Sequence, residues 1–147
     1  MANDPMLVAC PACAALNRLP PDRMADGGKC GRCGARLFDG HPIALTAANF
    51  DAHANRADLP LLVDFWAAWC GPCRQMAPAF EAAAHDLEPR VRLGKLDTEA
   101  EQGIAARWDI RSIPTLILIH KGREIARQAG AMPATAIVQW ARRALGA

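Results

Sequence analysis

The chain has 147 residues, of which 52% are hydrophobic and 22% charged, and its formal net charge is +2. This length holds one domain of ordinary size, or one domain with a small extra module. The composition is globular and excludes a disordered chain, and the small net charge argues against nucleic acid or an acidic membrane as a partner. No apolar run reaches the roughly 18 residues that span a bilayer, so we expect no membrane segment.

All six cysteines fall into three Cys-x-x-Cys pairs. Each pair is too close in the sequence to tether much of the chain as a disulfide, so the pairs favour metal binding and redox catalysis over a disulfide scaffold. The first five residues hold no basic region followed by an apolar core, which is the pattern of a secretory signal. We therefore expect a cytoplasmic protein.

Two of the cysteine pairs are separated by sixteen residues near the start of the chain. Four thiolates from two tight turns can bind one Zn²⁺ tetrahedrally. Because so short a segment has little core, the metal would contribute much of its folding energy. Two redox-active dithiols or a pair of disulfides are the alternatives, and His41 is a weaker candidate ligand. The expected zinc ligands are Cys10, Cys13, Cys30 and Cys33.

Gly40 and Pro42 break any regular structure after this segment. We therefore divide the chain into a small N-terminal zinc-binding module, residues 1–40, and a main domain, residues 41–147. The main domain alternates runs typical of strands and of helices. Its expected elements are an edge strand at 43–45, a helix at 47–56, a buried strand at 61–68, a helix at 71–87, a strand at 91–97, a helix at 99–108, a strand at 115–119, a hairpin strand at 124–127 and a last helix after Pro133. This order predicts a mixed sheet with helices on both faces.

The third cysteine pair, Cys70 and Cys73, lies where the buried strand is followed by the helix at 71–87. Backbone N–H groups at a helix start are unpaired and carry partial positive charge, so a thiolate is stabilised there. Cys70 is nearer the helix start and predicted to be the nucleophile, and Cys73, one turn further, the resolving thiol of thiol–disulfide exchange. A second metal site or an inert buried pair are the alternatives, but this pair supplies only two ligands.

Asp64 is a carboxylate inside the buried run. An unpaired buried charge is expensive, so we expect burial to raise the pKa of Asp64 and to let it exchange a proton with Cys73. Lys95 on the neighbouring strand is its expected partner. The alternative is a satisfied ion pair at a strand end.

The run from Asp64 to Cys73 resembles the active-site segment of thioredoxins, and Ile113-Pro114-Thr115 and Gly130 extend the match over roughly residues 43–147. The first forty residues resemble the zinc ribbon of the second bacterial thioredoxin type, thioredoxin-2. The resemblance implies the thioredoxin fold, a central mixed β-sheet flanked by helices. The Gly-Pro dipeptide between the cysteines implies a reducing member of that fold.

The resemblance also implies a cis proline at Pro114, facing the active cysteines and presenting the Ile113 backbone to an extended substrate. The expected substrate-contacting residues are Trp69, Gly71, Pro72, Ile113, Pro114, Gly130 and Ala131. The implied partners are protein disulfides and an NADPH-dependent flavoenzyme, thioredoxin reductase. We expect a monomer with one zinc ion and no organic cofactor.

Two other functions stay open from the sequence. The ribbon could recruit nucleic acid or a protein, which would make the chain a binding module, although residues 1–42 hold five Lys/Arg against four Asp/Glu and so no basic concentration. The chain could instead be an oxidant or an isomerase. The four histidines are scattered along the sequence, and we expect them at the surface.

Overall fold

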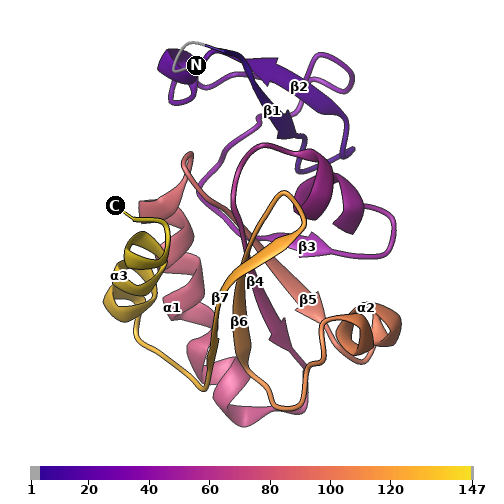
Figure 1. The fold of residues 1–147 in the computed structure, drawn as a ribbon, viewed down its shortest axis with the longest axis vertical. Helices are drawn as coiled ribbons and strands as arrows, with labels where there is room; N and C mark the ends of the chain where they lie inside the picture. The colour runs from indigo at the N-terminus through magenta and orange to yellow at the C-terminus, as the bar shows by residue number, and fades with distance from the viewer. Residues whose placement is uncertain (1–3, 147) are drawn as a thin grey trace.

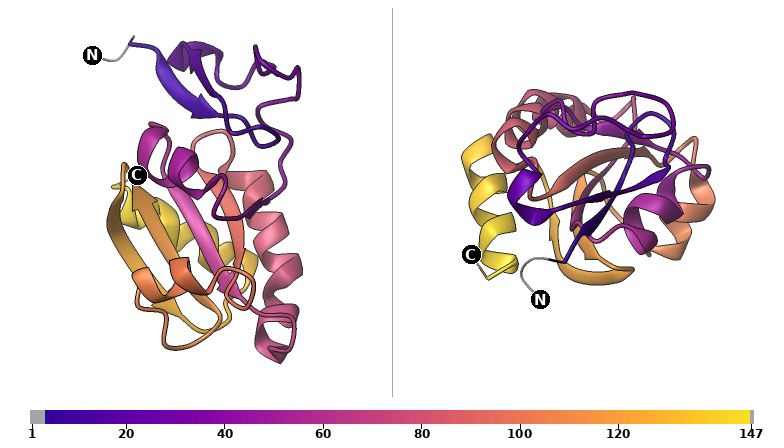
Figure 2. Two further views of the ribbon diagram at one scale, coloured as in Figure 1. Left: turned by 90° about the vertical axis from the view of Figure 1, so that its right-hand side faces the viewer. Right: turned by 90° about the horizontal axis from the view of Figure 1, so that it is seen from above.

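The computed structural model describes residues 4–146, which form a small ribbon at one end of a larger α/β unit (Figure 1). In the ribbon, β1 (Met6–Ala9) pairs antiparallel with β2 (Leu16–Leu19), and a 3-10 turn, η1 (Pro21–Arg23), follows. Figure 2 shows the same stacking from the side, with the ribbon above the end of the sheet. We call residues 4–40 the ribbon and residues 41–146 the body.

The body is built on a five-stranded mixed sheet with strand order β3-β5-β4-β6-β7. The three strands β3, β5 and β4 run parallel, whereas β6 is antiparallel to β4 and to β7. The central position of β4 explains its apolar sequence, because both of its faces are covered. The strands are β3 (Ile43–Leu45), β4 (Leu61–Trp66), β5 (Arg92–Asp97), β6 (Thr115–His120) and β7 (Arg123–Ala129).

Helices cover both faces of the sheet (Figure 1). On one face, α1 (Gly71–Leu87) and α3 (Ala134–Ala144) pack around Leu62 of β4. On the other, the π-helical turn η2 (Ala52–Arg56) and α2 (Gln102–Arg107) share a core with Leu61 and Val63. Since side chains alternate along a strand, Asp64 lies on the same face as Leu62, under α1.

The predicted order of strands and helices in the body is confirmed, and α1 has the predicted bounds. Two helices are shorter than predicted. The Asp97 carboxylate accepts the N–H groups of Glu99 and Ala100, so a turn precedes α2. Thr46 likewise accepts the Ala48 N–H, and helical structure begins only after this turn.

The prediction of surface histidines is wrong for His53. This residue lies in η2, against the ribbon, and is 2% exposed. Its Nε2 has no hydrogen-bond partner among the described residues, and burial together with the nearby Arg92 lowers its pKa to about 4. His41 and His85 are exposed, as predicted, whereas His120 is half-buried with its Nε2 2.9 Å from the Asp58 carbonyl oxygen.

Gly94 of β5 leaves room for a neighbouring side chain, and this gives a test of the packing between β3 and β5. A Cβ at position 94 would lie 2.7 Å from Cγ of the buried Leu45. We expect Gly94→Ala to lower the free energy of unfolding by about 1–3 kcal/mol through overpacking, measured by urea unfolding. Gly103→Ala in α2 is the control: its Cβ meets nothing within 4 Å, and the change should stabilise the helix. Equal midpoints for the two variants would contradict the packing argument.

Candidate active site

The active cysteine pair sits at the junction of β4 and α1. Cys70 is the N-cap residue of α1, and the Cys73 N–H donates to Cys70 Sγ over 3.2 Å. The two residues form a disulfide with a Cα–Cα distance of 5.3 Å. The Cys73 N–H belongs to the first turn of α1, where backbone N–H groups have no acceptor within the helix. It therefore points at Cys70 Sγ, as the sequence predicts.

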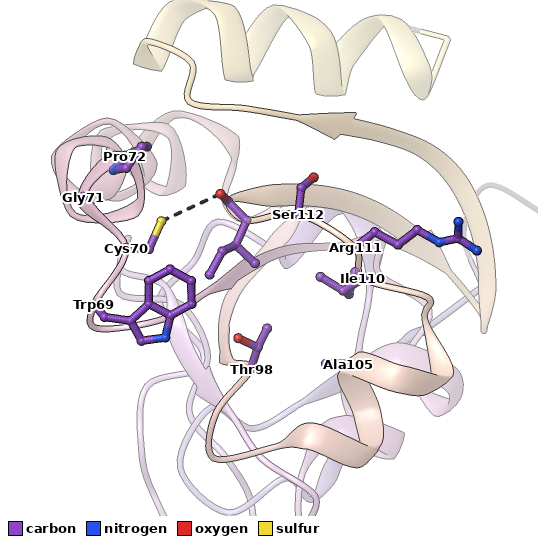
Figure 3. A pocket seen from close by; sticks show the side chains of 10 residues that line it. Trp69, Cys70, Gly71, Pro72, Thr98, Ala105, Ile110, Arg111 and Ser112 are labelled. Atoms are coloured by element: carbon purple, nitrogen blue, oxygen red, sulfur yellow. Dashed lines mark hydrogen bonds between the residues drawn. The ribbon is translucent and has the colours of Figure 1, made fainter.

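Cys70 and Cys73 differ in their position relative to a pocket at the surface. Their residue exposures, 4% and 2%, are nearly equal. However, Cys70 lines an open pocket of about 540 Å³ next to Trp69, and Cys73 does not (Figure 3). An incoming sulfur atom would therefore reach Cys70 first.

The loop before β6 forms the opposite wall of this pocket. The Ile113–Pro114 peptide bond is cis, in agreement with the prediction. Cys70 Sγ lies 3.8 Å from the Ile113 carbonyl oxygen, the contact marked by the dashed line in Figure 3. The Gly130 N–H donates to the Pro114 carbonyl over 2.9 Å, which ties the segment after β7 to this loop. Ala131, next along the chain, is exposed.

Trp69 is 67% exposed, which is unusual for so large an apolar side chain. Its indole Nε1–H donates to Glu99 Oε1 over 2.7 Å, so the ring is held in place beside the pocket. Glu99 was not predicted as part of the site. Only the fold brings it there, because it follows β5 whereas Trp69 follows β4.

The pocket includes more residues than the sequence predicted. Four of the expected substrate residues line it: Trp69, Gly71, Pro72 and Ile113. The rest of its wall comes from the end of β5, α2 and the loop before Ile113, and the Arg111 side chain extends away from Cys70 (Figure 3). The unpredicted lining residues are Thr98, Ala105, Ile110, Arg111 and Ser112. Arg111 and Ser112 directly precede Ile113, so their place in the chain is a signal that could have found them.

Asp64 is fully buried beneath this site, and neither of its carboxylate oxygens has a hydrogen-bond partner among the described residues. Burial raises the pKa of Asp64 to about 7, against the opposing influence of the Lys95 charge. A carboxyl group with this pKa exchanges its proton near neutral pH.

Lys95 is the direct register partner of Asp64 across β4 and β5. Its ammonium group lies 4.5 Å from the centre of the Trp66 ring, a cation–π contact. No ion pair within 4.0 Å joins Lys95 to Asp64 in the described part of the chain, so the satisfied-ion-pair alternative does not hold. Lys95 acts on Asp64 through its electric field.

The four N-terminal cysteines come together in the ribbon, with all four sulfur atoms within 4.8 Å of one another. They are carried by two turns of matching geometry, since the Ala14 N–H donates to the Cys10 carbonyl just as the Gly34 N–H donates to the Cys30 carbonyl. Ala14 and Gly34 both have positive φ, 65° and 81°. Four converging sulfurs in this arrangement match the donor set of a structural Zn²⁺ site.

Neighbouring donors favour the thiolate form of one of these cysteines, Cys30. The Asn17 side-chain N–H lies 3.5 Å from Cys30 Sγ, and the Arg32 N–H donates to the same sulfur over 3.3 Å. The Asn17 hydrogen bond, together with the backbone N–H groups of Cys33 and Arg32, lowers the pKa of Cys30 to about 6. Asn17 Oδ1 also accepts the Gly31 N–H over 2.9 Å, so one side chain of β2 holds the second turn at two points.

Comparison with known proteins assigns both parts of the chain. Residues 41–143 match the family model described as Thioredoxin, and residues 9–35 match the model described as Thioredoxin 2, N-terminal. The chain belongs to the thioredoxin family. The expected fold class is confirmed by the mixed sheet, its covering helices and the cysteine cluster of the ribbon.

Individual thioredoxins are similar to this chain along most of their own length. Thioredoxin C-3 of Corynebacterium nephridii is 42% identical over 135 residues, which cover 92% of either chain. The thioredoxin of Haemophilus influenzae is 39% identical over 98 residues, 67% of this chain and 92% of its own. Among solved structures, chloroplastic thioredoxin z superimposes with a TM-score of 0.65 and 25% identity, over 73% of this chain and 96% of its own. The chain is therefore a protein-disulfide oxidoreductase.

The thioredoxin match covers β3 to α3, and the ribbon match contains all four clustered cysteines. Within residues 4–146, no helix is both long and apolar enough to cross a membrane.

Proposed function

We propose that this thioredoxin reduces protein disulfides. The Cys70 thiolate attacks one sulfur of a substrate disulfide, forms a mixed disulfide and displaces the other substrate sulfur as a thiolate. Cys73 then attacks Cys70 Sγ, which releases the second substrate sulfur and leaves the Cys70–Cys73 disulfide. Two electrons pass to the substrate. The observation that carries this direction of attack is that Cys70, and not Cys73, lines the pocket.

Cys73 must lose its proton before it attacks, and we assign the acceptance of that proton to Asp64. The support is its burial, its unpartnered oxygens and its pKa of about 7. Lys95 is assigned the role of limiting this pKa, because its positive charge favours the ionised carboxylate.

The substrate segment is proposed to bind in extended form across the pocket. The Ile113 carbonyl, 3.8 Å from Cys70 Sγ, would accept a backbone N–H of that segment, as an added strand does. On the side of α1, the substrate segment would contact Trp69, Gly71 and Pro72. On the opposite side, it would contact Ala131 and the hydrogen-bonded residues Pro114 and Gly130. The apolar lining favours cysteines flanked by apolar residues.

The oxidised pair must be reduced again, and we propose a flavin- and NADPH-dependent thioredoxin reductase as the electron donor. A reducing compartment such as the cytoplasm suits this cycle. Insulin reduction, coupled to such a reductase, tests the function. The competing oxidant or isomerase role predicts a reduction potential near that of protein disulfide isomerases, about −180 mV, instead of thioredoxin's roughly −270 mV.

We further propose that residues 1–40 form a zinc module that modulates the enzyme without taking part in catalysis. One Zn²⁺ would bind Cys10, Cys13, Cys30 and Cys33, and it would hold the two turns of the ribbon together. The four converging sulfurs support this, and so does the exposure of Cys33, which lets oxidants reach the cluster. Each hydrogen peroxide that is reduced to water would convert two of these thiolates into a disulfide and weaken the metal site.

The zinc module is tested by titration with hydrogen peroxide. We expect one zinc per chain before oxidation, and release of that zinc with loss of ribbon structure as the four thiolates are oxidised, while the body stays folded. Zinc content, thiol count and insulin reduction are followed in the same samples. Zinc that stays bound up to damaging oxidant levels would leave only a structural role. Loss of insulin reduction in a folded variant lacking the four cysteines would instead make the ribbon essential for catalysis.

A further inference from the structure

A buried ion pair lies where α1 connects to β5. Arg92 Nη1 is 3.4 Å from Glu88 Oε2, and the two side chains are only 3% and 4% exposed. Burial raises the pKa of Glu88 and lowers that of Arg92, so both charges are held against a desolvation cost. Neither residue belongs to the active site, and neither is explained by the chemistry proposed above.

Both members of this pair also bind the ribbon. Arg92 Nη2 donates to the Ala9 carbonyl over 2.9 Å, and its guanidinium lies 4.6 Å from the centre of the Phe38 ring. The Gly40 N–H donates to Glu88 Oε1 over 2.8 Å. The two ends of the ribbon, Ala9 near its start and Phe38 to Gly40 at its end, therefore supply the atoms that keep the buried charges satisfied.

The position of Ala9 connects the pair to the cysteine cluster. Ala9 directly precedes Cys10, whose own N–H and carbonyl make the hydrogen bonds of the first turn. Fixing the Ala9 carbonyl thus fixes the backbone from which the first expected zinc ligand extends. Groups outside the ligand shell that orient metal ligands commonly change metal affinity by about 10–100-fold when they are removed.

We propose that Arg92, held by Glu88, is a positioning residue for the zinc site, and that through it zinc binding in the ribbon stabilises the body. The inference rests on the zinc site proposed above. With zinc bound, the ordered ribbon presents Ala9, Phe38 and Gly40 to the pair. Without zinc the ribbon loosens, the pair loses these partners, and the body loses the stabilisation that docking supplies.

The first experiment compares Arg92→Met combined with Glu88→Gln against Arg90→Met in the full chain. The double variant removes both buried charges together, so it leaves neither one unpaired. Arg90→Met is the control for the Arg→Met exchange itself, because Arg90 lies in the same connection and is exposed. Zinc affinity is measured by competition with a chromophoric chelator, and thermal unfolding by far-UV circular dichroism, which follows the helices of the body.

We expect the double variant to bind zinc about 10–100-fold more weakly than the wild type, and Arg90→Met to bind it normally. In the wild type, stripping zinc should lower the melting temperature of the body. In the double variant this zinc-dependent shift should be smaller, because the connection through the buried pair is then lost while the contacts of Leu7 with Asp58 remain. Wild-type zinc affinity and an unchanged shift in the double variant would overturn the proposal.

A second measurement uses only the wild-type protein, so that it stands even if the double variant does not fold. Hydrogen exchange at the Gly40 N–H, which donates to Glu88, is compared with and without zinc. Faster exchange after stripping is the expected result, and unchanged protection would show that docking does not depend on the metal. A wild-type protein that binds no zinc at all would refute the zinc site itself, whereas normal zinc binding without these couplings would refute only the role of Arg92.

Discussion

Replacement of Cys70 by serine is expected to reduce insulin-disulfide reduction to the uncatalysed rate. A serine hydroxyl is not ionised near neutral pH, and it cannot form the mixed disulfide with which the reaction begins. The fold should survive, because the exchange is nearly isosteric and Cys70 lies at a helix N-cap, where serine is a favoured residue. The measurement is the initial rate of insulin reduction, with circular dichroism of the same sample.

Cys73→Ser separates the two cysteines. This variant keeps the nucleophile and loses the resolving thiol, so it should accumulate a mixed disulfide between Cys70 and the substrate, detectable by mass spectrometry. The double variant Cys70→Ser, Cys73→Ser is the control, and it should form no mixed disulfide through the active pair. A mixed disulfide in Cys70→Ser and none in Cys73→Ser would reverse the assigned roles.

Asp64→Asn is expected to make the protein more stable above neutral pH while slowing its turnover. In the folded protein the pKa of Asp64 is raised from 3.8 to about 7. Between these values the folded chain holds a proton that the unfolded chain has released, so wild-type stability falls as the pH rises through this window. Asparagine has no charge to bury. The gain at about pH 8 should be a few kcal/mol, since each pKa unit corresponds to about 1.4 kcal/mol.

Urea unfolding of Asp64→Asn and wild type at several pH values measures this gain. The gain should vanish below about pH 3, where Asp64 is protonated in the folded and in the unfolded chain alike. Asp86→Asn, at an exposed position on α1, is the matched control for the Asp→Asn exchange. In the same variants, the rate of disulfide reduction should fall only for Asp64→Asn. A wild-type pH–rate profile in Asp64→Asn would exclude Asp64 as the group that accepts the proton.

The parts of the site that were predicted correctly have local signals in the sequence. A cysteine pair directly after an apolar run and directly before a stretch of helix-forming residues defines its own geometry, and α1 indeed begins at Gly71. The buried carboxylate of Asp64 could be recognised for the same reason, since its neighbours on both sides in the chain are apolar. The cis bond before Pro114 came from family resemblance and not from local chemistry.

The parts that were missed depend on contacts between distant segments. Glu99 reaches Trp69 only because β4 and β5 are neighbours in the sheet, and no spacing in the sequence indicates this. His53 and Arg92 look like surface residues in the sequence, because each is a polar side chain beside a helix or strand end. Both are buried by the ribbon, and how a small module docks on a domain is decided by side chains on two separate surfaces.

The distribution of aromatic residues gives this protein two optically distinct parts. It has four tryptophans and no tyrosine, and all four tryptophans belong to the body. Trp66 packs against the cluster that contains the active pair, and Trp69 lines the pocket beside Cys70. Trp108 packs edge-on against Phe50, with ring centres 6.2 Å apart, in the core that also contains η2. Indole fluorescence therefore originates in the body alone, because the ribbon contains no tryptophan. A change in emission when zinc is removed would thus report a structural change in the body that is caused by loss of the metal from the ribbon.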